Sequence, residues 1–204
     1  MPAMTEPEKI VLASASPRRR RLLEEARIPF EVVPADVDET PLPGETPAEL
    51  ASRAAAEKGM SVAARLAGEG RRPWILAADT VVVLETEILN KPRDPADAAS
   101  MLRRLSGRTH TVVTAFVVGR MDDRWYVEHH ATRVRFHELS TDAIAAYVAT
   151  GEGADKAGSY AIQEIGAFLV DRIDGDYFNV VGLPVSRVIR ALLAAGAIAA
   201  YPPR

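Results

Sequence analysis

The feature that most constrains the fold is a short apolar stretch that runs directly into a basic helix. Residues Lys9–Ala13 (KIVLA) predict a strand. Ser16 and Pro17 follow, and these residue types are preferred at a helix N-cap and at the first helical position. The predicted helix then carries four consecutive arginines, Arg18–Arg21, before its apolar face begins at Leu22.

This strand-to-helix corner has the properties of an anion site. A helix N-terminus presents unpaired N–H groups and a partial positive charge, and both favour phosphates. Arginines in the first turn oppose the helix dipole, and such a local conflict is expected at functional sites. We therefore interpret the corner as a phosphate-binding site, with a solvated basic helix end as the alternative.

The rest of the chain alternates between helix and strand patterns. We expect helices at Ala48–Ala67, from Asp94 to a stop at Gly107, at Asp142–Ala149 and at Pro184–Ala195. Strands are expected at Phe30–Val33, Trp74–Ala78, Val81–Leu84 and Phe168–Val170, and a hairpin at His110–Val118 and Arg124–His137. This alternation predicts a single α/β domain over residues 1–204, built on a mixed sheet.

Composition excludes several classes of protein. The net charge of −3 argues against bulk nucleic-acid binding, which needs a strongly basic face. The absence of cysteine excludes disulfides, thiolate nucleophiles and cysteine-based zinc sites. No apolar run approaches the roughly 18 residues of a membrane span, and no signal peptide is recognisable, so we expect a cytoplasmic protein that does not bind membranes.

Common catalytic motifs are also missing from the sequence. It contains no GxxxxGK[ST] loop, no GxGxxG fingerprint and no GxSxG elbow, which disfavours P-loop ATPases, dinucleotide enzymes and serine hydrolases. The histidines do not have the spacing of a metal site. We interpret them as structural or exposed: His110, His129, His130 and His137.

Asp79 is the strongest candidate for a functional carboxylate. It follows the apolar run Trp74–Ala78, so we expect it at the carboxyl end of a central strand, where open α/β sheets bind their ligands. A carboxylate there can bind a divalent metal, or orient and deprotonate a water molecule. The alternative is an aspartate that only caps the next turn through Thr80.

Three further charged residues have two interpretations each. Glu39 lies in the acidic loop Pro34–Pro47, where it either joins Asp79 as a metal or water ligand or only increases solubility. Lys58, in the middle of a helix, and Lys91, before Pro92, are either point charges for a phosphate or simply exposed.

Six segments together resemble motifs of the Maf family of nucleoside triphosphate pyrophosphatases, in the family's order and over nearly the whole chain. They are LASASPRRRRLL (12–23), AADTVV (77–82), NKPRD (90–94), LSGRTHTVVTA (105–115), DKAGSYAIQ (155–163) and GDYFNVVGLP (175–184). The resemblance implies a Maf/ITPase-like fold, with a twisted mixed sheet flanked by helices and a central cleft. It also implies hydrolysis between the α and β phosphorus atoms, which yields a nucleoside monophosphate and pyrophosphate.

This activity gives the candidate residues their expected roles. Asp79 would be catalytic and, with Glu39, would hold Mg²⁺ or Mn²⁺ and orient the attacking water. Arginine binds phosphate well because its guanidinium offers a bidentate fork. The residues expected to bind the substrate are Ser14, Arg18, Arg19, Lys58 and Lys91.

Three positions imply the subgroup of the family that acts on dTTP and UTP, including modified pyrimidine nucleotides. The resemblance places specificity at Arg18, Thr80 and Gln163, where a subgroup acting on methylated GTP has Trp, Gln and Glu. Gln163 offers a donor and an acceptor, which match a pyrimidine imide. Glu164 departs from the family pattern, because glycine is usual after this glutamine.

The resemblance leaves one alternative function open. The family's association with septum formation suggests a nucleotide-binding regulator of cell division that does not turn its ligand over. In either case the partner is a nucleoside triphosphate rather than a nucleic acid, and the family implies a homodimer.

Overall fold

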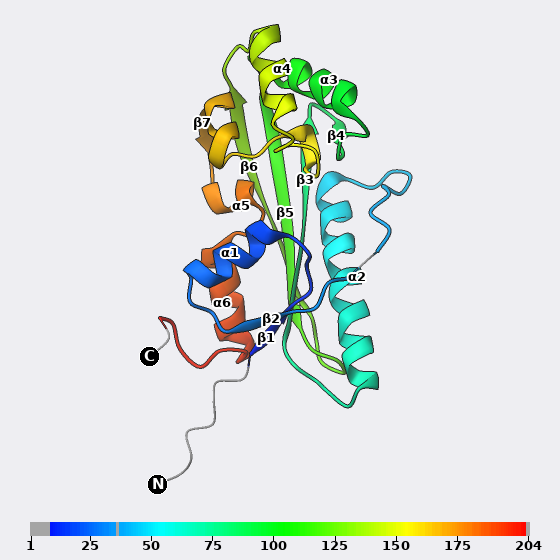
Figure 1. The fold of residues 1–204 in the computed structure, drawn as a ribbon. Helices are drawn as coiled ribbons and strands as arrows, with labels where there is room; N and C mark the ends of the chain where they lie inside the picture. Colours follow the sequence, from blue (N-terminus) through cyan, green and yellow to red (C-terminus); the bar gives the residue numbers. More distant parts are fainter. Residues whose placement is uncertain (1–8, 36, 203–204) are drawn as a thin grey trace. The chain divides into compact units, whose positions relative to one another are not determined.

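A computed structural model describes residues 9–35 and 37–202 and shows two compact units (Figure 1). Unit 1 comprises the described residues up to 79 together with 115–129 and 183–202, and unit 2 comprises 80–114 and 130–182. Three strands contribute residues to both units: β3 (Ile75–Leu84), β5 (Thr109–Gly119) and β6 (Tyr126–Phe136).

Unit 1 is built on parallel pairing. Strand β1 (Ile10–Leu12) pairs in parallel with β2 (Phe30–Val32) and with the start of β3, in the register Leu12↔Val32 and Leu12↔Leu76. Strands β1 and β3 are apolar and buried at this point, as expected for a parallel sheet covered on both faces. The helices α1 (Pro17–Glu25) and α6 (Val185–Ala195) lie on one side of these strands and α2 (Pro47–Gly68) on the other (Figure 1).

Helix α2 is fixed at its N-terminus and by close packing near its centre. Thr46 and Glu49 form a complete capping box, in which each side chain bonds the backbone N–H of the other residue. At Gly59 the helix approaches Trp125 so closely that an added Cβ would lie 2.7 Å from the indole ring. The neighbouring Lys58 is therefore carried by a turn of helix with little freedom to shift.

Unit 2 is built on antiparallel pairing. The end of β3 pairs with β4 (Glu87–Leu89), and β6 pairs with β7 (Val170–Asp174). The helices of unit 2 are α3 (Pro95–Leu105), α4 (Thr141–Ala149) and α5 (Tyr177–Val181), with two 3₁₀ segments at Ala157–Ser159 and Glu164–Leu169. The order of strands in the whole sheet is β2-β1-β3-β5-β6-β7, with β4 paired to β3, so the predicted mixed α/β sheet is confirmed.

The predicted helix bounds agree with the structure to within about a residue for α2, α4 and α6, whereas the predicted strand Phe168–Val170 is wrong. Phe168 and Leu169 end a 3₁₀ segment, and strand β7 runs from Val170 to Asp174 instead. Strand β7 lies at the end of the strand order and is rich in charged residues, as edge strands are, so no apolar run marks it. Among the described residues, no helix is long and apolar enough to cross a membrane.

Candidate functional site

Unit 1 brings together five of the residues singled out in the sequence. Lys58, on α2, donates hydrogen bonds to Asp79 Oδ1 at 2.6 Å and to Glu39 Oε1 at 2.5 Å. The side chains of Lys58 and Asp79 are only 9% and 10% exposed, whereas that of Glu39 is 39% exposed. One buried ammonium therefore bridges two carboxylates, one of them also buried. We call Ser14, Arg19, Glu39, Lys58 and Asp79 the unit 1 cluster.

Ser14 and Arg19 form the second part of this cluster, at the corner between β1 and α1. Arg19 Nη1 donates to Ser14 Oγ at 3.1 Å, and the same oxygen accepts a hydrogen bond from the backbone N–H of Ser16. Ser16 in turn caps α1, because its hydroxyl accepts from the backbone N–H of Arg19. The predicted helix start at Ser16 and Pro17 is confirmed.

The electrostatics of Arg19 connect the two parts of the cluster. Burial lowers the pKa of Arg19, and Arg18 lowers it further, whereas the carboxylates of Asp79 and Glu39 raise it. The guanidinium remains charged, as arginine does in proteins. Charges of both signs thus meet at the N-terminus of a helix, where a phosphate would also be attracted by the helix dipole.

Asp79 does not end its strand, so this part of the prediction is wrong. Strand β3 continues through Asp79 to Leu84, because beyond it the strand pairs antiparallel with β4. The strand that ends here is β1, the parallel neighbour of β3. Its last pairing joins Leu12 to Leu76, shortly before Asp79 on β3. Asp79 therefore lies beyond the carboxyl end of β1. From this position its side chain accepts the hydrogen bond from Lys58.

The donor set suits a metal ion only in part. No group of three or more histidine, cysteine, aspartate or glutamate side chains in residues 9–35 and 37–202 could hold a metal ion. Glu39 and Asp79 supply two carboxylates, and both already contact Lys58. Mg²⁺ is commonly held by one or two carboxylates with substrate phosphates completing its shell, so the pair fits a cation that arrives with a phosphate ligand.

The other predicted residues belong to unit 2, apart from Arg18, which lies half-buried in the first turn of α1. Thr114 Oγ1 donates to the backbone oxygen of Asn179 at 2.8 Å. Since a hydroxyl has one proton, Thr80 must be the donor in its 2.9 Å contact with Thr114 Oγ1. This chain of hydrogen bonds fixes the side chain of Thr80, the residue after Asp79.

Lys91 is exposed, and Gln163 is half-buried at the start of a 3₁₀ segment. The next residue, Glu164, has a positive φ of 55°. Glycine adopts this left-handed conformation without strain, whereas a side chain costs free energy there. The backbone at Glu164 therefore has the conformation that suits the glycine usual in the family.

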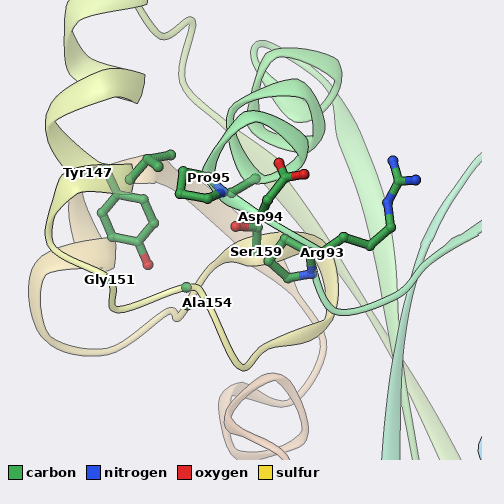
Figure 2. Close-up of a pocket in the computed structure, with 11 residues that line it drawn as sticks. Arg93, Asp94, Pro95, Tyr147, Gly151, Ala154 and Ser159 are labelled. Carbon is green, nitrogen blue, oxygen red and sulfur yellow. The ribbon is translucent and has the colours of Figure 1, made fainter.

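Unit 2 also contains a pocket of about 290 Å³, whose lining includes residues of two segments that carry the family resemblance, 90–94 and 155–163 (Figure 2). It lies between the start of α3 and the segment 147–159, and Pro95, Tyr147 and Ser159 are among its lining residues. None of the residues predicted to bind substrate lines it.

The histidines agree with their prediction as structural or exposed residues. His110 is buried, and its Nε2 lies 2.7 Å from the hydroxyl of Tyr160. Burial lowers its pKa to about 4, so the ring is neutral at physiological pH. His129 and His137 are exposed, and His130 is half-buried.

Sequence reasoning missed one charged residue next to the cluster. Arg53, on α2, makes hydrogen bonds to both neighbours of Glu39 in the chain. Its spacing of four residues from Glu57 on the same helix was the available signal, but that spacing is common on solvated helix faces.

Comparisons with known proteins agree with the resemblance found in the motifs. Residues 9–195 match the family described as Maf-like protein. The chain is 50% identical over 194 residues to a dTTP/UTP pyrophosphatase of Geobacter sulfurreducens, covering 95% of this chain and 100% of that protein. It is 47% identical over 180 residues to a dTTP/UTP pyrophosphatase of Clostridioides difficile, covering 88% of this chain and 91% of that protein.

Solved structures show a likeness of fold at low sequence identity. A HAM1 protein from Coxiella burnetii aligns with a TM-score of 0.51 at 15% identity, covering 94% of this chain and 100% of that chain. At this identity the likeness concerns the fold alone.

Proposed function

Since the chain belongs to the Maf family, we propose that it hydrolyses dTTP, UTP and related pyrimidine nucleoside triphosphates to the monophosphate and pyrophosphate. The relatives named dTTP/UTP pyrophosphatase support this reaction. The observation that carries the proposal is the Lys58 bridge between Asp79 and Glu39, next to a helix N-terminus with a buried arginine. Such a cluster offers both cations for phosphates and a carboxylate for water.

The cationic side chains bind the triphosphate in this proposal. Ser14 and Arg19 act at the start of α1, where backbone N–H groups also attract phosphate oxygens. Arg18 and Lys58 add positive charge in the same unit, and Lys91 is the remaining cation that we assign to the phosphates. Phosphoryl transfer depends mainly on positioning and charge neutralisation, so these residues account for most of the catalytic effect.

Asp79 is the proposed base. Its carboxylate accepts the proton of a water molecule whose oxygen forms a bond to the α phosphorus. The bond from that phosphorus to the bridging oxygen breaks, and pyrophosphate leaves with the electron pair. Lys58 and Arg19 stabilise the negative charge that spreads over the phosphate oxygens.

Asp79 and Glu39 are also the residues that would hold Mg²⁺ or Mn²⁺. When bound, the cation supplies further neutralisation of the phosphate charge. Lys58 contacts one oxygen of each carboxylate, Glu39 Oε1 and Asp79 Oδ1. These two oxygens are therefore already close together before a cation and substrate bind.

Specificity for the base is proposed to depend on Arg18, Thr80 and Gln163. An imide such as uracil presents carbonyl acceptors beside an N–H donor, and the amide of Gln163 can satisfy both. The hydrogen bond from Thr80 to Thr114 holds one of these side chains in a fixed rotamer.

The test is pyrophosphate release from dTTP, UTP, CTP, GTP and ATP, each with Mg²⁺, with Mn²⁺ and with a chelator. The proposal predicts fast release from dTTP and UTP that needs a divalent cation. Preference for a purine would refute the subgroup, and full activity with the chelator would refute the cation. Binding of nucleotide without release would support the cell-division regulator instead.

A further inference from the structure

We propose that Arg53 is a positioning residue for the reaction, because it fixes the loop that holds Glu39 against Lys58. The inference rests on the proposed function, since it assigns Glu39 a part in catalysis. Arg53 acts in this proposal through the backbone of the loop rather than by contact with the substrate.

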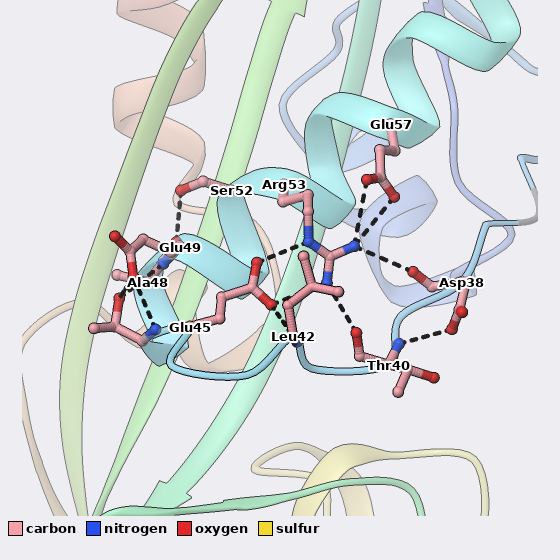
Figure 3. A network of polar contacts seen from close by, with 10 residues as sticks. Asp38, Thr40, Leu42, Glu45, Ala48, Glu49, Ser52, Arg53 and Glu57 are labelled. Carbon is pink, nitrogen blue, oxygen red and sulfur yellow. Dashed lines mark hydrogen bonds and ion pairs between the residues drawn. The ribbon is translucent and has the colours of Figure 1, made fainter.

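The guanidinium of Arg53 bonds the loop on both sides of Glu39 (Figure 3). Nη2 donates to the backbone oxygen of Thr40 at 2.9 Å, and Nη1 lies 3.5 Å from the backbone oxygen of Asp38. These carbonyls belong to the residues immediately before and after Glu39. The backbone that carries the Glu39 side chain is therefore fastened to α2 at both ends.

The same guanidinium also binds two carboxylates. Nε and Nη2 donate to Glu45 at 2.7 and 3.0 Å, in a bidentate pair, and Nη1 lies 3.3 Å from Glu57. Glu45 is at the far end of the loop and its side chain is only 9% exposed, whereas Glu57 immediately precedes Lys58 on α2. The planar guanidinium of Arg53 thus connects both ends of the loop to the turn of α2 that carries Lys58.

The loop has little else to fix it. Residues 37–45 form neither helix nor strand. Apart from the bonds with Arg53 and the bond between Lys58 and Glu39, the loop has local hydrogen bonds from Thr40 to Asp38 and between Leu42 and Glu45. The Glu39 side chain is 39% exposed, so water competes for its carboxylate even though its partner Lys58 is buried. The position of Glu39 therefore depends on its backbone as well as on its bond to Lys58, and Arg53 holds that backbone on both sides.

Arginine is required for this role because of its geometry. Lysine would keep the positive charge, but a single ammonium group cannot reach two carbonyls and two carboxylates in one plane. Arg53→Lys therefore separates the effect of charge from that of the fork. Arg104→Gln is the matched control, because Arg104 also forms a two-nitrogen pair with one glutamate, Glu87, and both residues belong to unit 2, whereas the loop 37–45 belongs to unit 1.

Two measurements on Arg53→Gln test the proposal. Hydrogen–deuterium exchange reports the loop directly, and we expect residues 38–45 to exchange about tenfold faster than in the wild type, with the rest of the protein protected. Pyrophosphate release from dTTP reports the consequence, and we expect kcat/KM to fall about tenfold to hundredfold. For Arg53→Lys, we expect a loop exchange rate and a kcat/KM between those of Arg53→Gln and those of the wild type. For Arg104→Gln, both quantities should equal the wild-type values.

A double-mutant cycle with Glu39→Gln distinguishes positioning from a general loss of stability. If Arg53 acts through Glu39, then Arg53→Gln lowers kcat/KM in the wild type but has almost no further effect in Glu39→Gln. Multiplicative losses, or unchanged loop exchange in Arg53→Gln, would overturn the proposal. A wild type without pyrophosphatase activity would instead refute the proposed function, and the exchange measurement would still decide whether Arg53 holds the loop.

Discussion

Lys58 and Asp79 form an ion pair of 2.6 Å in which both side chains are about nine-tenths buried. Removing two charges from water costs several kcal/mol, and their attraction offsets this only when the geometry is good. Apolar residues of similar volume would often be as stable in such a place. Stability alone therefore does not account for the pair, and the effects of its loss on stability and on turnover can be tested separately.

We predict that Lys58→Met destabilises the protein and nearly abolishes turnover. The substitution leaves the buried carboxylate of Asp79 without its ammonium partner, so the free energy of unfolding at pH 7 should fall by about 3 kcal/mol. Loss of a cation that faces developing charge should lower kcat/KM about a hundredfold. Urea denaturation and pyrophosphate release measure the two effects.

The double variant Lys58→Met, Asp79→Asn is the control for stability. It removes both charges, so it should be more stable than Lys58→Met alone while remaining inactive. If the double variant is instead destabilised by the sum of the two single effects, the pair does not interact as the structure shows.

Gln163→Glu should weaken the preference for pyrimidine substrates. The carboxylate keeps the acceptors of glutamine but loses its donor, so it repels a carbonyl oxygen of uracil or thymine. A lost hydrogen bond to the base is expected to lower kcat/KM for dTTP and UTP about tenfold to hundredfold, with a smaller effect on other triphosphates. Equal losses for all nucleotides would show that Gln163 does not contact the base.

His110 should make the protein less stable as the pH falls from neutral. Burial depresses its folded-state pKa to about 4, below the ordinary value of 6.5, so the unfolded chain binds the proton more readily. The stabilisation is complete above pH 6.5 and is lost as the pH falls to 4, by about 3 kcal/mol in all.

The measurement compares urea denaturation of the wild type and His110→Leu between pH 7 and pH 4. The difference between the two proteins isolates this histidine from the carboxylates, which titrate in both. A parallel pH dependence in the two proteins would contradict the prediction, as would an NMR titration that places the pKa of His110 near 6.5.

The elements with local signals were predictable from the sequence. Helix α3 begins at Asp94 and Pro95, an N-cap and a first-turn proline that act within a few residues. Helix α5 was missed because five residues are too few for an apolar periodicity, although Asp176 caps it. Strand β3 was predicted to end at Asp79 because its apolar run ends there, whereas pairing with β4 carries it further.

The site was predictable in its residue types but not in its contacts. Lys58 and Glu39 each had a second, unremarkable interpretation, because neither spacing nor periodicity relates an acidic loop to the middle of a helix. Their contact depends on the path of a loop without regular structure, and that path is set by Arg53, whose bonds are long-range. Only the folded chain shows this relationship.

The most direct measurement is product analysis of dTTP hydrolysis by the wild type and by Asp79→Asn, at equal enzyme and Mg²⁺ concentrations. The account predicts equimolar dTMP and pyrophosphate from the wild type, and a loss of at least about a hundredfold in the variant with nucleotide binding retained. Formation of dTDP and phosphate, or undiminished turnover by Asp79→Asn, would contradict it.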